Sequence, residues 1–337
     1  MLFTNNTPLP AALIRSSHDD DEMLALILVC ATYRFGPAGL ELTEEQKPLQ
    51  LAPDPDYPND VHFMKDCVSV CASGYVHAPE GEAKRAVAAL SVGDARSEVV
   101  AFGPRVWGES ILAGTLTPTS PRPFTRVPML WDNAYGGAVW QPAMTIEVEG
   151  QDCIVPERDE GYMLNMAGTG FYRDPEAALH QPLPQLEHPD QLIKRWDDRP
   201  EPVCFAPYLL RGGLRAASLV RDQKVDFDRL GRVASRSAPR TTFLDIPAGT
   251  RIGVEGMRPE KEILAFEVPS SPVAIAVMVG ALERRVTPRL DAVDIDAEAG
   301  TVRLVYRSGF RYPLVAFDIR RARVEPSGAF PAKSPQG

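Results

Sequence analysis

Histidine is the first residue type to consider, because it can bind a metal or carry a proton near neutral pH. His18 lies in an acidic run that ends at Glu22 and could bind a cation, although acidic runs before a strand are usually solvated. His180 and His188 flank a proline-rich loop without cysteines to complete a zinc site, and no two histidines have the H-x-x-x-H spacing. The sequence therefore predicts no metal site.

Nucleophilic chemistry and phosphate binding have equally weak signals. The sequence lacks the G-x-S-x-G motif, and Ser69 and Ser73 fall within a strand-like run, where hydroxyl groups usually pair across the sheet. The tripeptide at 168–170 contains G-x-G, but no third glycine or Walker lysine follows it. We interpret this glycine pair as a turn, and we expect no catalytic residue and no cofactor.

Four carboxylates between residues 187 and 198 offer one further possibility. Two carboxyl groups can hydrolyse a glycoside, and this group consists of Glu187, Asp190, Asp197 and Asp198. Solvated acids are the more common outcome, since Asp and Glu are mostly exposed. We therefore predict a non-enzymatic protein, with a carbohydrate-active or other hydrolytic enzyme of β fold as an alternative.

Aromatic residues beside glycines stand out more than the polar groups do. Trp107 lies just after Gly103, and Tyr135 directly precedes Gly136 and Gly137. Aromatic side chains in loops can anchor a protein interface, and they can equally close the ends of a β structure. For Trp107 and Tyr135 we favour the structural interpretation.

Composition limits both the fold and the partners. The chain of 337 residues contains 32 prolines, which disfavours a long helical bundle because proline interrupts helices. Its formal net charge of −9 would repel nucleic acid. The odd count of five cysteines predicts buried reduced thiols rather than a disulfide framework.

Neither targeting nor membrane insertion is indicated. Residues 1–13 lack the basic start and apolar core of a signal peptide. The longest apolar run, 273–282, has about half the length that a membrane helix needs. We therefore expect a cytoplasmic protein that makes no membrane contact.

Apolar runs predict strands along most of the chain, joined by many turns. A buried strand is expected over 23–35, with a hairpin partner near Leu40 and Leu42. Residues 156–215 have little periodicity, and a short helix is expected near 190–196. The other regions predicted to form strands or hairpins are 67–77, 83–92 with 95–107, 144–155, 249–256 with 262–269, 273–285, 290–295 with 301–306, and 314–324.

These elements predict a mainly β fold, with antiparallel sheets in a sandwich-like arrangement of two lobes. The N-terminal lobe covers residues 1–155 and the C-terminal lobe covers 216–325. An irregular connector, 156–215, packs on the lobes, and 326–337 form a flexible tail. One continuous domain over 1–325 is the alternative.

A series of short motifs in fixed order extends over most of the chain. G-D-R-x-W, A-F-G-G, N-P-x-G-x-G-F and L-P-N-x-E-x-P correspond to residues 103–107, 134–137, 165–171 and 183–189, with Pro104 in place of the acid. An acidic-then-lysine entry to a strand corresponds to residues 60–65. The residues selected as family signature or partner contacts are Arg105, Trp107, Tyr135, Gly136, Gly137, Asn165, Gly168, Gly170, Phe171, Pro184, Glu187 and Pro189.

This ordered series resembles the bacterial family known as domain of unknown function 2169 (DUF2169), of which the chain looks like a divergent member. The resemblance implies a type VI secretion accessory protein. Such an adaptor holds a secreted effector and helps to mount it on the spike formed by VgrG and its PAAR tip, and it needs no cofactor. A structural component of the spike or baseplate is a second alternative.

Overall fold

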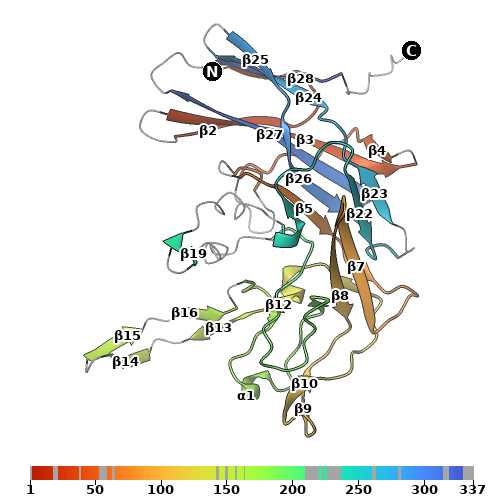
Figure 1. Ribbon diagram of the computed structural model, residues 1–337, viewed down its shortest axis with the longest axis vertical. Coiled ribbons are helices and arrows are strands. Elements are labelled where there is room, and N and C mark those ends of the chain that lie inside the picture. Colours follow the sequence, from red (N-terminus) through yellow and green to blue (C-terminus); the bar gives the residue numbers. More distant parts are fainter. Residues whose placement is uncertain are drawn as a thin grey trace.

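The structure is a computed structural model in which β-sheets follow one another along the longest axis of the molecule (Figure 1). Among the described residues strands predominate and the α-helix is a single turn, so the prediction of a mainly β fold is confirmed. The structure describes residues 2–17, 22–37, 39–52, 59–62, 65–141, 144–148, 151–155, 158–162, 164–208, 220–221, 224–225, 237–259, 263–279, 282–313 and 319–328.

A seven-stranded sheet forms the centre of the molecule, in the order β2-β3-β27-β26-β5-β21 with β4 beside β3. Strand β26 is parallel to β5, and the other neighbours are antiparallel. Residues 25–33 of β3 are all buried, which explains why they are apolar except for Thr32. The strands of this sheet are β2 (Ala11–Ser17), β3 (Glu22–Gly36), β4 (Gly39–Leu42), β5 (Val68–Ser73), β21 (Thr242–Phe243), β26 (Arg289–Asp296) and β27 (Thr301–Pro313).

Two further sheets extend the body, in the orders β18-β8-β7-β22-β23 and β1-β28-β24-β25. The predicted hairpins of β7 with β8, β22 with β23, and β26 with β27 are confirmed. Residues 273–285, which were predicted to form a strand pair or one long bent strand, form a pair of strands. Their bounds are β1 (Leu2–Asn5), β7 (Arg85–Val92), β8 (Ala95–Phe102), β18 (Leu186–Glu187), β22 (Arg251–Glu255), β23 (Leu264–Glu267), β24 (Val273–Val279), β25 (Leu282–Val286) and β28 (Ile319–Pro326).

Two-stranded ribbons and short helical turns complete the described chain. One ribbon, β9–β10, projects at the lower end of the molecule, and the ribbons β13–β16 and β14–β15 project at its side (Figure 1). The bounds of these elements are β6 (Tyr75–His77), β9 (Trp107–Ser110), β10 (Thr115–Pro118), β11 (Arg126–Pro128), η1 (Trp131–Asn133), β12 (Tyr135–Gly136), β13 (Ala138–Gln141), β14 (Met144–Val148), β15 (Gln151–Val155), β16 (Arg158–Gly161), β17 (Thr169–Gly170), α1 (Pro175–Ala178), β19 (Val220–Arg221), β20 (Lys224–Val225) and η4 (Pro239–Thr241).

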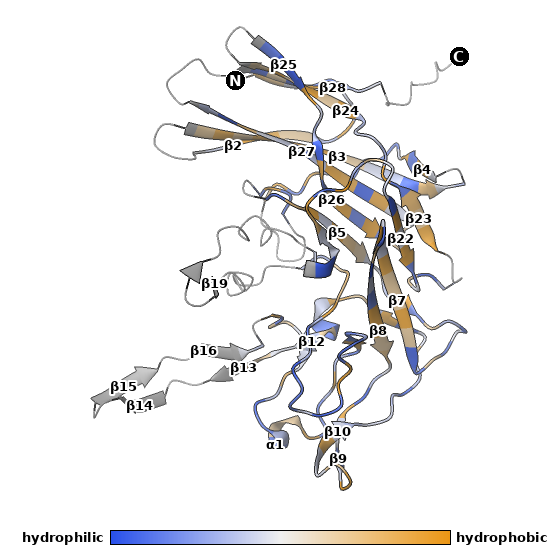
Figure 2. Ribbon diagram, viewed as in Figure 1, coloured by the Kyte–Doolittle hydropathy of each residue, from blue (hydrophilic) through white to orange (hydrophobic). Residues whose placement is uncertain are grey.

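One large apolar core joins the three sheets. Ile27 and Leu304 of the seven-stranded sheet, Leu90 and Ile252 of the five-stranded sheet, and Ile275 of the four-stranded sheet belong to the same buried cluster. Figure 2 shows the hydrophobic residues concentrated along the strands of these sheets. Strands from residues 1–155 and from 216–325 therefore share one core, while the division into two lobes stays a prediction.

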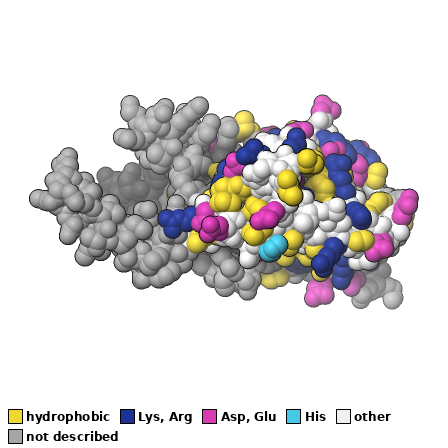
Figure 3. Space-filling view, turned by 90° about the horizontal axis from the view of Figure 1, so that it is seen from below, with side chains coloured by type: hydrophobic (Ala, Val, Ile, Leu, Met, Phe, Trp, Pro, Cys, Tyr) yellow, Lys and Arg dark blue, Asp and Glu magenta, His cyan; other side chains and the backbone are white. Residues whose placement is uncertain are grey.

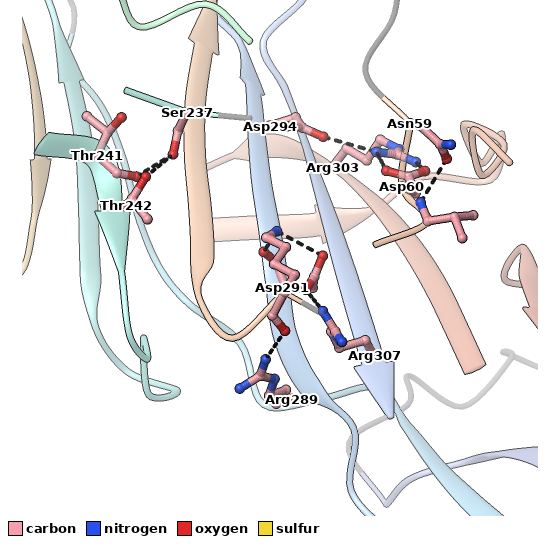
Figure 4. A network of polar contacts seen from close by, with 12 residues as sticks. Asn59, Asp60, Ser237, Thr241, Thr242, Arg289, Asp291, Asp294, Arg303 and Arg307 are labelled. Atoms are coloured by element: carbon pink, nitrogen blue, oxygen red, sulfur yellow. Dashed lines mark hydrogen bonds and ion pairs between the residues drawn. The ribbon is translucent and has the colours of Figure 1, made fainter. Parts of the chain in front are cut away.

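The seven-stranded sheet has a second face, opposite the large apolar core, with its own buried cluster that includes Leu26 and Val305. Ion pairs hold the segment before β5 against this face, as Figure 4 shows. Arg303 on β27 pairs with Asp60, and also with Asp294 on β26 at 3.0 Å. The Lys65 Nζ lies 3.0 Å from Asp291 Oδ2. The side chains of Arg303, Asp60, Lys65 and Asp291 are at most 4% exposed, so these charges are neutralised inside the protein. Asp60 and Lys65 of this motif thus fix the covering segment to the sheet.

The predicted helix near 190–196 is wrong. The described residues there form turns, in which Asp198 Oδ2 accepts the backbone N–H groups of Lys194 at 2.8 Å and Arg195 at 2.9 Å. The helix lies earlier, at α1, where the Asp174 side chain accepts the Ala177 N–H at 2.8 Å and a proline occupies the first turn. An acidic N-cap followed by proline is a stronger helix start than anything in 190–196.

Other predicted boundaries change where glycine or proline interrupts a strand. Strand β8 ends at Phe102 rather than at Trp107, because Gly103 and Pro104 follow it. The run over 67–77 divides at Gly74 into β5 and β6. The last predicted strand is β28, which ends at Pro326. His18, residues 314–318 and residues 329–337 of the predicted tail lie outside the described residues.

Candidate functional site: the buried motif cluster

Motif segments that are far apart in the sequence meet around β12 and β17. These strands pair in parallel, which places Gly136 opposite Gly170. The Asn165 Nδ2 donates hydrogen bonds to the carbonyl oxygens of Trp131 at 2.8 Å and Tyr135 at 3.1 Å. We call the group that meets here the motif cluster; it consists of Arg105, Trp107, Tyr135, Gly136, Gly137, Asn165, Gly168, Gly170, Phe171, Pro184 and Glu187.

A buried ion pair joins two of the predicted signature residues. Arg105 pairs with Glu187 Oε1, and its Nη2 also donates to the Pro184 carbonyl oxygen at 2.9 Å. Glu187 Oε2 accepts the Ile193 N–H at 2.9 Å, so both carboxylate oxygens are bound. Burial raises the pKa of the Glu187 carboxyl, while the Arg105 guanidinium acts in the opposite direction. The pair ties β18 to the loop before β9.

The aromatic signature residues fill a second, smaller core. Trp107 is 0% exposed and Tyr135 is 1% exposed, and both pack with Leu183. The Tyr135 ring meets the Tyr162 ring edge to face, with the centroids 4.9 Å apart. Phe171 is partly exposed, and the Arg199 guanidinium lies 5.2 Å from its ring centroid. In this conformation Trp107 and Tyr135 cannot touch a partner, which supports their structural interpretation.

The predicted carboxylate group does not form an open pair. The side chain of Glu187 is 0% exposed, so it cannot meet a sugar in this conformation. Asp198 is engaged in the turn described above, and Asp197 pairs with Arg195 at 3.0 Å. Asp190 is exposed, and Pro189 beside it is not in the motif cluster; both line a surface hollow together with Arg199.

The thiols and the possible metal ligands are also placed by the structure. Cys30, Cys67, Cys71 and Cys204 are buried and form no disulfide, which confirms the predicted reduced thiols for these four residues; the Cys153 side chain lies outside the description. Burial raises the pKa of the Cys204 thiol. Within the described residues no group of three or more side chains could hold a metal ion.

The burial of His188 leads us to predict that the stability of the protein depends measurably on pH. It is 1% exposed, and its Nδ1 accepts the Asp190 N–H at 3.1 Å, which fits a neutral imidazole. Burial lowers the pKa of His188, and Arg240 adds to this shift. The unfolded chain therefore binds a proton more readily, and stability should fall as the pH decreases below about 6.5.

Chemical denaturation between pH 7.5 and pH 5 tests this prediction. The acid loss of stability should be smaller in His188→Gln than in the original chain. His180→Asn is the matched control, because His180 is exposed and asparagine tolerates its positive φ of 63°. An equal acid loss in all three proteins would contradict the assignment.

The small core also supports an exposed feature that sequence reasoning missed. Trp107 and Leu116 anchor the two strands of the β9–β10 ribbon in this core. At the tip, Ile111 and Leu112 are 98% and 103% exposed. Two adjacent apolar residues in a turn that ends in glycine are the signal that could have revealed it, since turns usually carry polar residues.

The protein is mainly β, and most of its signature residues are buried. Together they form a platform that supports the projecting β9–β10 ribbon. The family described as "uncharacterized protein conserved in bacteria (DUF2169)" matches residues 20–307, and the chain belongs to this family. Neither the comparison with curated proteins nor the comparison with solved structures finds a match. No helix among the described residues has the length and apolar character to cross a membrane.

Proposed function

We propose that this chain is a non-enzymatic adaptor that binds a type VI secretion effector and helps to load it onto the VgrG/PAAR spike. The family membership supports the resemblance from which this function was inferred. The observation that carries the proposal is the burial of the signature residues. Inside the protein Arg105 pairs with Glu187, and Asn165 donates to the Tyr135 carbonyl oxygen. A partner would therefore meet the surface that these residues support rather than the residues themselves.

The proposal places the protein in the cytoplasm, where it holds the effector before export and uses no cofactor. A net charge of −9 fits a partner that is a protein rather than a nucleic acid. Specificity in such a complex comes from surface complementarity, with a few buried anchor residues supplying most of the affinity.

Co-purification of the full-length chain with the effector encoded in a neighbouring gene tests the proposal. We expect a stable complex on size-exclusion chromatography, formed through the effector or through its PAAR region. The absence of a complex with the effector, PAAR and VgrG proteins alike would contradict the adaptor function.

The same preparation separates the alternatives. A stable trimer of the free chain in light scattering would favour a structural component of the spike or baseplate. Turnover of a carbohydrate that is lost when a single residue is changed would favour an enzyme.

A further inference from the structure

The tip of the β9–β10 ribbon carries an unusual apolar pair. Ile111 and Leu112 are the most exposed large hydrophobic residues in the described part of the chain. Figure 3 looks at the end of the molecule that includes this ribbon, where hydrophobic side chains lie among acidic and basic ones. Single exposed apolar residues are common, but two adjacent ones on a projecting turn mark an interaction site.

Hydrogen bonds within the ribbon close the turn at its tip. The Gly114 N–H donates to the Ser110 carbonyl oxygen at 2.9 Å, and the Ala113 N–H donates to Ser110 Oγ at 3.2 Å. At the base of the ribbon the Trp107 N–H donates to the Gln181 carbonyl oxygen at 3.0 Å, and the indole is buried. A partner would therefore gain the apolar contact without the cost of ordering the ribbon.

We infer that the β9–β10 ribbon inserts Ile111 and Leu112 into an apolar pocket of the effector polypeptide. This inference rests on the proposed function and names the surface that performs it. A narrow tip with two side chains fits a pocket rather than a broad flat interface. Burying each side chain strengthens association roughly ten- to hundred-fold.

A polypeptide fits this tip better than a lipid surface does. The chain has a net charge of −9, and Glu109 next to the tip is exposed, so an anionic membrane would repel it. Two side chains are also too little for anchoring, since a whole myristoyl chain binds membranes only marginally. A pocket with a basic or hydrogen-bond-donating rim would complement Glu109.

The test compares the full-length chain with a double variant, Ile111→Ser with Leu112→Ser, by calorimetric titration against the purified effector of the neighbouring gene. We expect at least about 100-fold weaker binding, about 2.8 kcal/mol, with an unchanged melting temperature because both residues are solvent-exposed. The control is Leu244→Ser with Ile263→Ser, which removes side chains that are 63% and 57% exposed elsewhere. The control should bind like the original chain.

The outcomes separate this inference from the proposed function. If the original chain does not bind the effector, the proposed function fails. If the original chain and the tip variant bind equally, the adaptor stands and the inference about the ribbon is wrong. The inference is also overturned if the original chain, but not the variant, binds phosphatidylcholine–phosphatidylglycerol vesicles or forms a dimer in light scattering.

Discussion

Replacing Arg303 with Met is expected to lower the free energy of unfolding by about 3–5 kcal/mol. The change leaves the Asp60 and Asp294 carboxylates on the second face of the seven-stranded sheet without their cation. It also removes the donor to the Pro48 carbonyl oxygen, 3.2 Å from Arg303 Nη2. Because natural domains are stable by only about 5–15 kcal/mol, a loss of this size should be plain in guanidinium denaturation.

The matched control is Arg34→Met on β3 of the same sheet. Arg34 pairs with Glu41 at 2.8 Å, but the two side chains are 66% and 42% exposed, so the loss should be at most about 1 kcal/mol. Adding Asp60→Asn to Arg303→Met should recover part of the stability, since it removes one of the unpaired buried charges. Equal losses in Arg303→Met and Arg34→Met would show that the buried pair does not hold the covering segment.

The sequence predicted those parts of the fold that depend on local patterns. The buried strand β3 follows from the largely apolar run of 23–35, and the hairpin of β26 and β27 follows from two alternating runs around a turn ending in Gly300. The parallel pairing of β26 with β5 joins residues more than 200 positions apart, and no local pattern encodes it. Sheet order was therefore beyond prediction.

The sequence predicted which residues belong to the candidate site, but not how they contact one another. The ordered motifs selected Arg105 and Glu187 without showing that they pair with each other, because 82 positions separate them. The G-x-G pattern of Gly168 and Gly170 was interpreted as a turn, whereas the structure also pairs Gly170 with Gly136. Ile111 and Leu112 escaped notice because an apolar pair in a turn shows only from its sequence neighbours, and its full exposure shows only in the structure.

Gly136→Ala is expected to destabilise the protein by about 2–6 kcal/mol, the combined cost of backbone strain and overpacking. The φ angle of Gly136 is 154°, and a Cβ there would lie 1.9 Å from the Asn165 carbonyl oxygen. That oxygen accepts the Gly137 N–H at 2.9 Å, so the backbone on both sides would have to move. The β12–β17 pairing would separate, and thermal or chemical denaturation would register the loss.

Gly249→Ala distinguishes the collision from the backbone conformation. Gly249 has a φ of 85° with no atom within 4 Å of a Cβ, so this change carries only the strain of a left-handed residue, about 1–2 kcal/mol. Under the proposed adaptor function, Gly136→Ala should also weaken effector binding, because the neighbouring Tyr135 packs in the same small core as Trp107 at the base of the β9–β10 ribbon. Gly249→Ala should leave binding intact. If Gly136→Ala lost no more stability than Gly249→Ala and bound the effector normally, the motif cluster would not be the platform that positions the ribbon.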